Sequence, residues 1–170
     1  MALWIALHDD LADPRSDDPI ARISTRVLCV SVKNAPSSMD PVLIQKEFGS
    51  RNFGAMLALY GAKTLEEYST PAMRKLARDG SPLEHATKDD PPLFLEFTGD
   101  LTKTPLPADT KFGGWIHHPH FGELMQRKYD ELGLECHFYH AGKPAPEGTE
   151  IAFLKKCFAP RGQAKTPAPQ

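Results

Sequence analysis

Apolar residues in this chain fall into short runs separated by polar or proline-rich stretches, and the runs show two kinds of pattern. Residues 26–32, 93–97 and 135–139 are nearly continuous and rich in β-branched or aromatic side chains, which is typical of strands covered on both faces. Residues 119–132 carry apolar side chains at helical spacing, and we expect further helices at Ala2–Leu7 and Thr149–Phe158. The pattern therefore predicts three strands separated by helices.

Start and stop signals predict several short helices between the first two strands. Asp40, followed by a proline, has the chemistry of a helix N-cap, and Gly49 is placed to end that helix. Thr64, with a glutamate three residues later, has the spacing of a capping box, and Thr70 repeats the cap-then-proline arrangement. We expect a helical insertion over about residues 41–80.

The order strand, helices, strand, helix, strand, helix predicts an α/β fold with a parallel sheet and right-handed crossovers. Prolines and glycines between the second strand and the helix at 119–132 predict a long loop there. We expect one domain over residues 1–158 and a disordered tail over 159–170, where three prolines interrupt a stretch without apolar periodicity. With three strands, one edge of the sheet is expected to lack its neighbour.

Composition narrows the classes of partner. The 170 residues are 41% hydrophobic and 25% charged, and 20 basic against 22 acidic residues give a net charge of -2. This balance offers no electrostatic footprint for nucleic acid. Ala2–Leu7 is apolar but has no basic leader, and acidic residues follow it at once, so we expect neither a signal peptide nor a membrane span. From these residues we expect a cytoplasmic location.

Three cysteines, Cys29, Cys136 and Cys157, are an odd number for a disulfide framework. Cys29 and Cys136 fall in the runs that we interpret as buried strands. We therefore expect free thiols in a reducing compartment.

The histidine cluster His117, His118 and His120 is the first candidate for a metal site, because histidine is the commonest transition-metal ligand. A helix beginning at residue 119 would leave two of the rings in the preceding loop and one inside the helix. Glu123 is the carboxylate at convenient helical spacing. Since zinc needs three or four converging ligands, we predict that this segment holds no metal.

The acidic clusters are interpreted as structural features and not as binding or catalytic sites. The aspartates between residues 9 and 18 lack the glycine and terminal glutamate of a dedicated calcium loop, so we interpret them as a solvated acidic loop. Asp89 and Asp90 precede a proline and are interpreted as turn residues rather than paired catalytic carboxylates. The apolar run 53–60 is interpreted as packing within the helical insertion rather than as a partner or lipid face.

Four segments together resemble an α/β-hydrolase of the esterase/lipase kind, in its carboxyl-terminal part. SPLEHATKDDPPLFLEFTGD (81–100) resembles the loop, late core strand and Gly-Asp turn of that superfamily. HFGELMQRKYDELGLECHFY (120–139) resembles the following helix and final strand, and IAFLKKCF (151–158) resembles the closing helix. ALWIALHDDLADP (2–14) resembles the helix that leaves the nucleophile elbow. The resemblance implies an incomplete α/β-hydrolase-like fold with a three-stranded parallel sheet and a helical cap insertion.

The resemblance also implies where a catalytic triad would lie. The serine of that family sits in a G-x-S-x-G turn, which would fall before Met1, and these residues contain no such motif. Thr102 stands where the acid is expected, and Asp100 matches the first, usually non-catalytic, acid of the turn. The histidine is expected in residues 141–147, but the last histidine is His140. We therefore assign no catalytic, cofactor-binding or metal-binding residue and expect no cofactor.

The leading hypothesis is a truncated or degenerate hydrolase, a pseudoenzyme that does not complete acyl transfer alone. One alternative is an active ester hydrolase completed by a separate amino-terminal half. Another is a non-catalytic module that binds a small apolar ligand in the cap pocket. The expected partners are the missing half or a second copy of the chain, through the exposed edge of the sheet.

Overall fold

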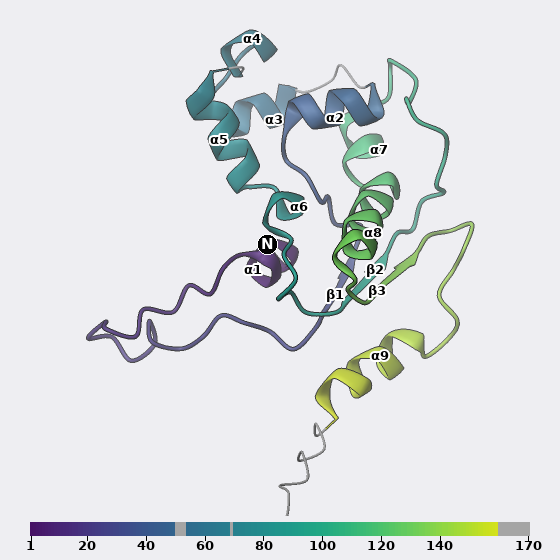
Figure 1. The fold of residues 1–170 in the computed structure, drawn as a ribbon. Helices are drawn as coiled ribbons and strands as arrows, with labels where there is room; N and C mark the ends of the chain where they lie inside the picture. The colour runs from purple at the N-terminus through teal and green to yellow at the C-terminus, as the bar shows by residue number, and fades with distance from the viewer. Residues whose placement is uncertain (50–53, 69, 160–170) are drawn as a thin grey trace, which may run out of the picture.

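The computed structural model of this chain describes residues 1–49, 54–68 and 70–159 (Figure 1). Most of the expected tail, from residue 160, and the first residue of the apolar run 53–60 therefore lie outside the described residues. In chain order the elements are α1 (Ala2–Leu7), β1 (Val30–Lys33), α2 (Pro41–Phe48), α3 (Gly54–Leu59), α4 (Leu65–Tyr68), α5 (Pro71–Asp79), α6 (Pro82–His85), β2 (Leu93–Glu96), α7 (Phe112–Ile116), α8 (His120–Leu132), β3 (Cys136–Tyr139) and α9 (Thr149–Phe158).

The three strands form one sheet in the order β1-β2-β3, and both neighbours of the central strand run parallel to it. Val30 lies opposite Leu93, which in turn lies opposite Cys136. Helices lie on both faces of this sheet (Figure 1). The predicted fold class, a three-stranded parallel sheet flanked by helices, is confirmed.

The first strand is shorter than the predicted run 26–32. Val30 is the first residue with a partner on β2, and the described residues offer no strand opposite the positions before it. Arg26 instead reaches a buried carboxylate, with its Nη1 3.5 Å from Oδ1 of Asp90. Leu28 is left about half exposed, at 49%. β1 therefore begins at the first residue that has a partner on β2, and not where the apolar run begins.

Packing on the sheet differs between its two faces because successive side chains of a strand point in opposite directions. Phe97 and Phe138 meet edge to face on the side covered by α8, with ring centroids 5.9 Å apart, and Gly122 of α8 lies directly against them. Phe94 points to the other side, where its ring lies 5.7 Å from that of Phe153 in α9. Both aromatic contacts tie a helix to the sheet.

The face under α9 is only partly covered, which corrects the expectation of strands covered on both faces. Ser31 and His137 are half-buried and Lys33 is exposed. On this face the sheet meets α9, a helix of ten residues, whose Glu150 and Phe153 contact Ser31, Phe94 and His137. Polar contacts occupy the uncovered part, where Lys33 Nζ lies 2.8 Å from Glu96 and 3.8 Å from Glu150 of α9.

The helix signals in the predicted insertion act as expected. Asp40 accepts a hydrogen bond from the backbone N–H two residues on, at 2.8 Å, and Gly49 ends α2 in the left-handed conformation with φ of 65°. Thr64 accepts from the N–H of Glu67 at 3.1 Å, and Thr70 caps α5. Local side-chain chemistry therefore sets these helix starts and stops.

A short helix, α7, lies within the region predicted to be a loop, so that prediction is wrong in part. Gly113 and Gly114 give this segment a low intrinsic preference for helix. Trp115 is nonetheless fully buried and Ile116 nearly so. Burial of these two large side chains outweighs the low helix propensity of the glycines. No local sequence pattern predicts this burial.

The cysteines are free thiols, as expected, but not in fully buried strands. Cys29 precedes β1 and Cys136 opens β3, and each is half-buried. Loss of solvation raises the pKa of both thiols to about 12, so they are protonated at neutral pH. The side chain of Cys29 also makes a hydrogen-bonding contact with that of Cys157 in α9.

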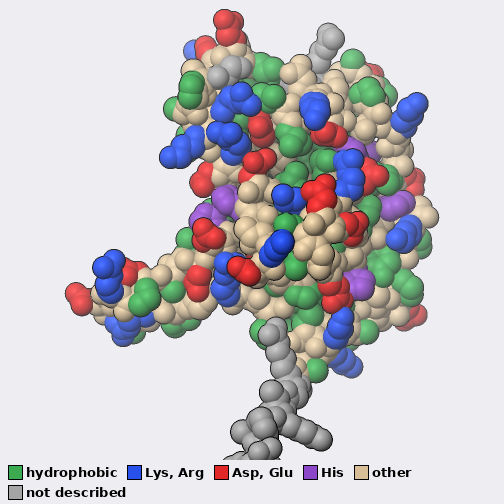
Figure 2. Space-filling view, viewed as in Figure 1, with side chains coloured by type: hydrophobic (Ala, Val, Ile, Leu, Met, Phe, Trp, Pro, Cys, Tyr) green, Lys and Arg blue, Asp and Glu red, His purple; other side chains and the backbone are tan. Residues whose placement is uncertain are grey.

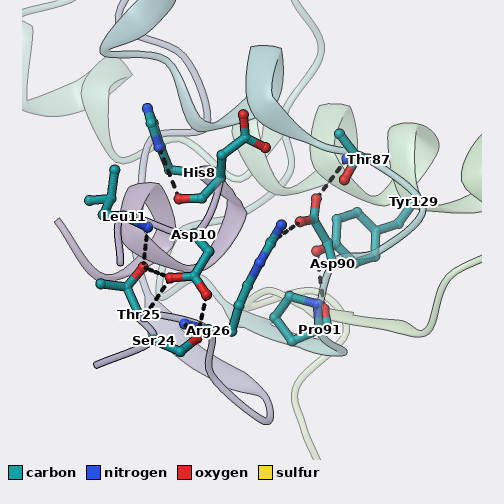
Figure 3. A network of polar contacts seen from close by, with 11 residues as sticks. His8, Asp10, Leu11, Ser24, Thr25, Arg26, Thr87, Asp90, Pro91 and Tyr129 are labelled. Carbon is teal, nitrogen blue, oxygen red and sulfur yellow. Dashed lines mark hydrogen bonds and ion pairs between the residues drawn. The ribbon is translucent and has the colours of Figure 1, made fainter. Parts of the chain in front are cut away.

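Residues 9–25 form an arm that stands away from the body of the molecule (Figures 1 and 2). Asp10 fastens its two ends together, because its carboxylate accepts from Ser24 Oγ at 2.6 Å and from the N–H groups of Thr25 and Ala12 (Figure 3). These hydrogen bonds lower the pKa of Asp10 to about 2. Asp10 thus acts within a surface loop, as predicted for this acidic segment.

Acidic and basic side chains are interspersed over the face shown in Figure 2. This agrees with the small net charge of -2. Within the described ranges, no helix is long and apolar enough to cross a membrane.

Gly122 provides a test of the contact between α8 and the sheet. A Cβ at this position would lie 2.6 Å from Phe97 Cε2 and 2.7 Å from Phe138 Cδ2. We predict that Gly122→Ala lowers the free energy of unfolding by about 1–3 kcal/mol, because the rings are packed and must shift. Chemical denaturation monitored by circular dichroism measures the change.

Gly113→Ala in α7 is the matched control, because a Cβ there meets nothing within 4 Å. It should leave stability unchanged or raise it by up to about 1 kcal/mol. Equal effects of the two substitutions would contradict the close approach of α8 to the sheet.

Candidate functional site

The carboxyl ends of parallel strands meet at one edge of a sheet, and ligand sites of α/β proteins lie there. In this chain, β1 ends into Asn34, β2 ends into the turn at residues 98–102, and β3 ends into His140. The histidine cluster also reaches this edge, since His117 Nδ1 lies 2.8 Å from the carbonyl oxygen of Asn34. The residues that the sequence offered as candidates for a triad or a metal site therefore lie at this edge.

Asn34 joins three segments at this edge. Its backbone has φ of 51°, a left-handed conformation that asparagine adopts more readily than most residues. The Asn34 N–H donates to the carbonyl of Glu96 at 2.8 Å, and its side-chain oxygen accepts from Thr98 N at 2.9 Å. The carbonyl of Asn34 accepts from His117. Asn34 thus links the ends of β1 and β2 to the histidine cluster.

A cleft of about 440 Å³ lies beside this edge. Asp100 and Thr102 line it from the turn after β2, and His117 and His118 line it from the segment between α7 and α8. The cleft is large enough for a small organic molecule. It brings together the two residues at the expected acid positions and two members of the histidine cluster.

His118 has a defined tautomer because of its neighbours. The N–H of His120 donates to His118 Nδ1 at 3.1 Å, so this nitrogen carries a lone pair. Burial, and then the charge of His120, lower the pKa of His118, which keeps the ring neutral with its proton on Nε2. That Nε2–H donates to Thr102 Oγ1 at 2.9 Å. His118 therefore cannot take the proton of Thr102 in this arrangement.

His120 lies between two carboxylates. Its Nδ1 is 2.6 Å from Glu123 Oε2, and its Nε2 is 3.1 Å from Glu47 Oε2 of α2. Carboxylates only accept hydrogen bonds, so both bonds are complete when both ring nitrogens carry protons. Glu123 follows from its i, i+3 spacing in the sequence, whereas no local pattern indicates Glu47. The bridge joins α2 to the start of α8.

The three imidazoles of the cluster therefore have separate partners. His117 donates to a backbone carbonyl, His118 bonds to a hydroxyl, and His120 bonds to two carboxylates. This arrangement agrees with the interpretation of the cluster as a loop-to-helix junction with local hydrogen bonds. The absence of a metal there remains a prediction.

Asp100 and His140 both approach Gly142, but no hydrogen bond joins them. A Cβ on this glycine would lie 3.4 Å from His140 Nδ1 and 3.8 Å from Asp100 Oδ1. The Nδ1 atom of His140 is buried and has no hydrogen-bond partner among the described residues. Since Gly142 has no side chain, it leaves room for an acid and an imidazole at the ends of neighbouring strands.

Among the described residues, no serine or threonine hydroxyl donates a hydrogen bond to an imidazole, although Ser31 Oγ donates to Glu150 on the face under α9. Ser37 donates its hydroxyl proton to the carbonyl of Phe121 at 2.9 Å, and Ser81 donates to that of Ala77 at 2.6 Å. A hydroxyl becomes a nucleophile when a general base accepts its proton, and these protons go to backbone carbonyls. Thr102, at the expected position of the acid, accepts from His118.

Asp89 and Asp90 lie in a turn and diverge, as predicted. Asp90 is buried, accepts from the N–H of Thr87 at 2.7 Å and pairs with Arg26, whereas Asp89 is exposed (Figure 3). Burial raises the pKa of Asp90. Tyr129 of α8 donates to the adjacent carbonyl of Pro91 at 3.1 Å. Asp90 thus anchors the entry to β2, and the divergence of the two side chains agrees with their interpretation as turn residues.

A parallel sheet with helices on both faces and candidate residues at its carboxyl edge places this chain in the α/β class. Its fold is similar to the crystal structure of an acetyl ester-xyloside bifunctional hydrolase from Caldicellulosiruptor lactoaceticus, with a TM-score of 0.55 and 19% sequence identity. The match covers 85% of this chain and 42% of that one, so this chain spans less than half of its length. No protein-family model and no curated protein matches the sequence. At this level of identity, the likeness shows a shared α/β fold over that part of the hydrolase.

His118 offers a direct test of the site geometry. The imidazole of an unfolded chain titrates near 6.5, and the folded pKa of His118 is lower because the ring is buried. The unfolded chain therefore binds more protons below pH 6.5. We predict that the free energy of unfolding decreases as the pH falls from 6.5 through the folded pKa of His118.

Nitrogen-detected NMR should show His118 as the Nε2–H tautomer near neutral pH. Thr102→Val, which removes the hydroxyl acceptor, should shift its Nε2 resonance and leave that of His137 unchanged. A Nδ1–H tautomer, or a folded pKa above 6.5, would contradict the geometry.

Proposed function

We propose that this chain is a truncated or degenerate α/β-hydrolase of the carboxylesterase kind that does not complete acyl transfer on its own. The similarity to part of an ester hydrolase supports the class of the fold. One observation carries the catalytic part of the proposal. The carboxyl edge of the sheet holds imidazoles and Asp100, but Thr102 accepts a hydrogen bond from His118 instead of donating its proton to that ring. The sequence also contains no G-x-S-x-G turn.

Acyl transfer by the serine route needs a nucleophile, a base beside it and amide donors where the oxyanion forms. This chain offers an acid and an imidazole, Asp100 and His140, at the ends of neighbouring strands. A second polypeptide would have to supply the serine and the oxyanion donors. The chain therefore contributes the sheet, the cleft and the acid-histidine side of such a site.

We predict that the purified chain hydrolyses 4-nitrophenyl acetate no faster than the same chain unfolded in urea, at equal imidazole concentration. Free imidazoles react slowly with this ester, so the unfolded chain is the matched background. A serine-directed fluorophosphonate should label no residue stoichiometrically. Labelling of one hydroxyl, with turnover lost when that residue is changed to Ala, would show that the chain carries its own nucleophile.

A second candidate function is an ester hydrolase assembled from two chains. Two observations favour it: His140 Nδ1 is buried without a hydrogen-bond partner among the described residues, and Asp100 approaches the same glycine, Gly142. Co-expression with the polypeptide encoded directly upstream provides the test. Ester turnover in the complex, abolished by His140→Ala and retained in His137→Ala, would establish this function. An inactive complex, or one indifferent to His140, would exclude it.

We further propose that the outer edge of β1 mediates association, either with such a partner or with a second copy. Among the described residues, β1 pairs on one side only, with β2. The approach to this edge exposes apolar side chains, including Val27 at 40% and Leu28 at 49%. Unpaired strand edges with apolar surroundings promote association.

We predict that the isolated chain self-associates in sedimentation experiments. Leu28→Lys should weaken this association by about tenfold or more, since burying a leucine contributes about 1.5–3 kcal/mol. Ile151→Lys on α9 is the control, because Ile151 is similarly exposed, at 55%. A dilute monomer with a sharp unfolding transition in calorimetry would exclude this association.

A further inference from the structure

His8, Asp79 and His85 form a cluster apart from the edge of the sheet. Each offers a ligand atom, and these three atoms lie within 4.8 Å of one another. His8 follows the last residue of α1, Asp79 is the last residue of α5, and His85 is the last residue of α6. The end of α1 therefore meets the ends of α5 and α6, which follow one another in sequence, and together they present two imidazoles and a carboxylate to one region.

The ligand chemistry suits a transition-metal ion. Zinc binds imidazole nitrogen and carboxylate oxygen at about 2.0–2.2 Å, so a tetrahedral ion holds its ligands about 3.4 Å apart. The separation of up to 4.8 Å thus closes by small rotations of the side chains, of which Asp79 is exposed and free to turn. Two histidines and one carboxylate are a donor set found in zinc sites with an open fourth position.

Each of the two rings has one nitrogen hydrogen-bonded to a backbone carbonyl and one nitrogen with a lone pair. His85 Nε2 lies 2.6 Å from the carbonyl oxygen of Asp79, and His8 Nδ1 lies 3.3 Å from that of Asp9. Carbonyl oxygens only accept, so these nitrogens carry the protons and the opposite nitrogens carry the lone pairs. Metal-binding histidines ordinarily donate their second N–H to a carbonyl or carboxylate in this way.

Trp4 of α1 further orders the cluster. Its indole N–H donates to the same carbonyl of Asp79 at 2.6 Å, and its ring centroid lies 4.3 Å from that of His8. The rings of His8 and His85 are themselves 4.6 Å apart. The carbonyl of Asp79 thus accepts from both Trp4 and His85, which fixes the end of α5 against α1.

We propose that His8, Asp79 and His85 bind a divalent transition-metal ion of the zinc class, which fastens the ends of α5 and α6 to α1. From the sequence alone we assign no metal-binding residue, so this proposal goes beyond the sequence. The site adjoins a mainly apolar cavity of about 470 Å³, because Trp4 and Asp79 also line that cavity together with Leu59, Tyr60 and Leu76. Binding of the ion stabilises the wall of this cavity.

The test is a zinc titration of the full chain, freed of metal with a chelator and followed by calorimetry. We expect one equivalent to bind and to raise the melting temperature, since the ion binds the folded state. Asp79→Asn keeps the shape of an exposed residue and should weaken binding, and His8→Ala with His85→Ala should abolish it. Loss of a ligand should exceed the roughly 10–100-fold that loss of a supporting hydrogen bond costs.

Controls separate this site from other zinc ligands. Cys29→Ser with Cys157→Ser removes the contacting thiols, and His117→Ala removes an exposed imidazole of the other cluster. Both variants should retain one equivalent. The proposal is wrong if the wild-type chain takes up no zinc at micromolar concentration, if Asp79→Asn and His85→Gln bind as the wild type does, or if the cysteine variant loses the ion. Melting curves in chelator verify that each variant is folded.

Discussion

β2 bonds to a strand on each side, and both neighbours run parallel to it, so this one strand fixes the position of everything that packs on the sheet. Its side chains Leu93, Phe94 and Leu95 are almost completely buried. Phe94 contacts α9, whereas Phe97, just beyond the strand, contacts Phe138 beneath α8. Because the strands are parallel, their carboxyl ends also meet at one edge, where the cleft lies.

At that edge, hydrogen bonding decides what chemistry is open to each side chain. His118 is held as a donor to Thr102, and His120 is held between Glu47 and Glu123. Only the Nδ1 atom of His140, beside Asp100, is a buried imidazole nitrogen without a partner among the described residues. The described residues thus place an acid and an imidazole at this edge, while the hydroxyl of Thr102 accepts a hydrogen bond from His118 instead of donating to a base.

The proposed metal site and the cleft use different parts of the fold. The cleft is built on strand ends, whereas His8, Asp79 and His85 stand at the ends of three helices. α1 contacts β1, and Trp4 of α1 bonds to Asp79 at the end of α5, so α1 connects the helical insertion to the sheet. An ion at this cluster would strengthen a junction that the hydrogen bonds of Trp4 and His85 to the carbonyl of Asp79 already hold.

Local chemistry in the sequence by itself determined the caps at Asp40 and Thr70, the stop at Gly49, the alternation of helices and strands, and the parallel sheet. Periodicity and capping depend on residues within a few positions of one another, so they can be predicted without the fold. Only the tertiary structure decided the start of β1, the helix α7, the contact of Glu47 with His120 and the cluster of His8, Asp79 and His85. Each of these depends on a partner distant in sequence, whose position follows from packing that no local pattern encodes.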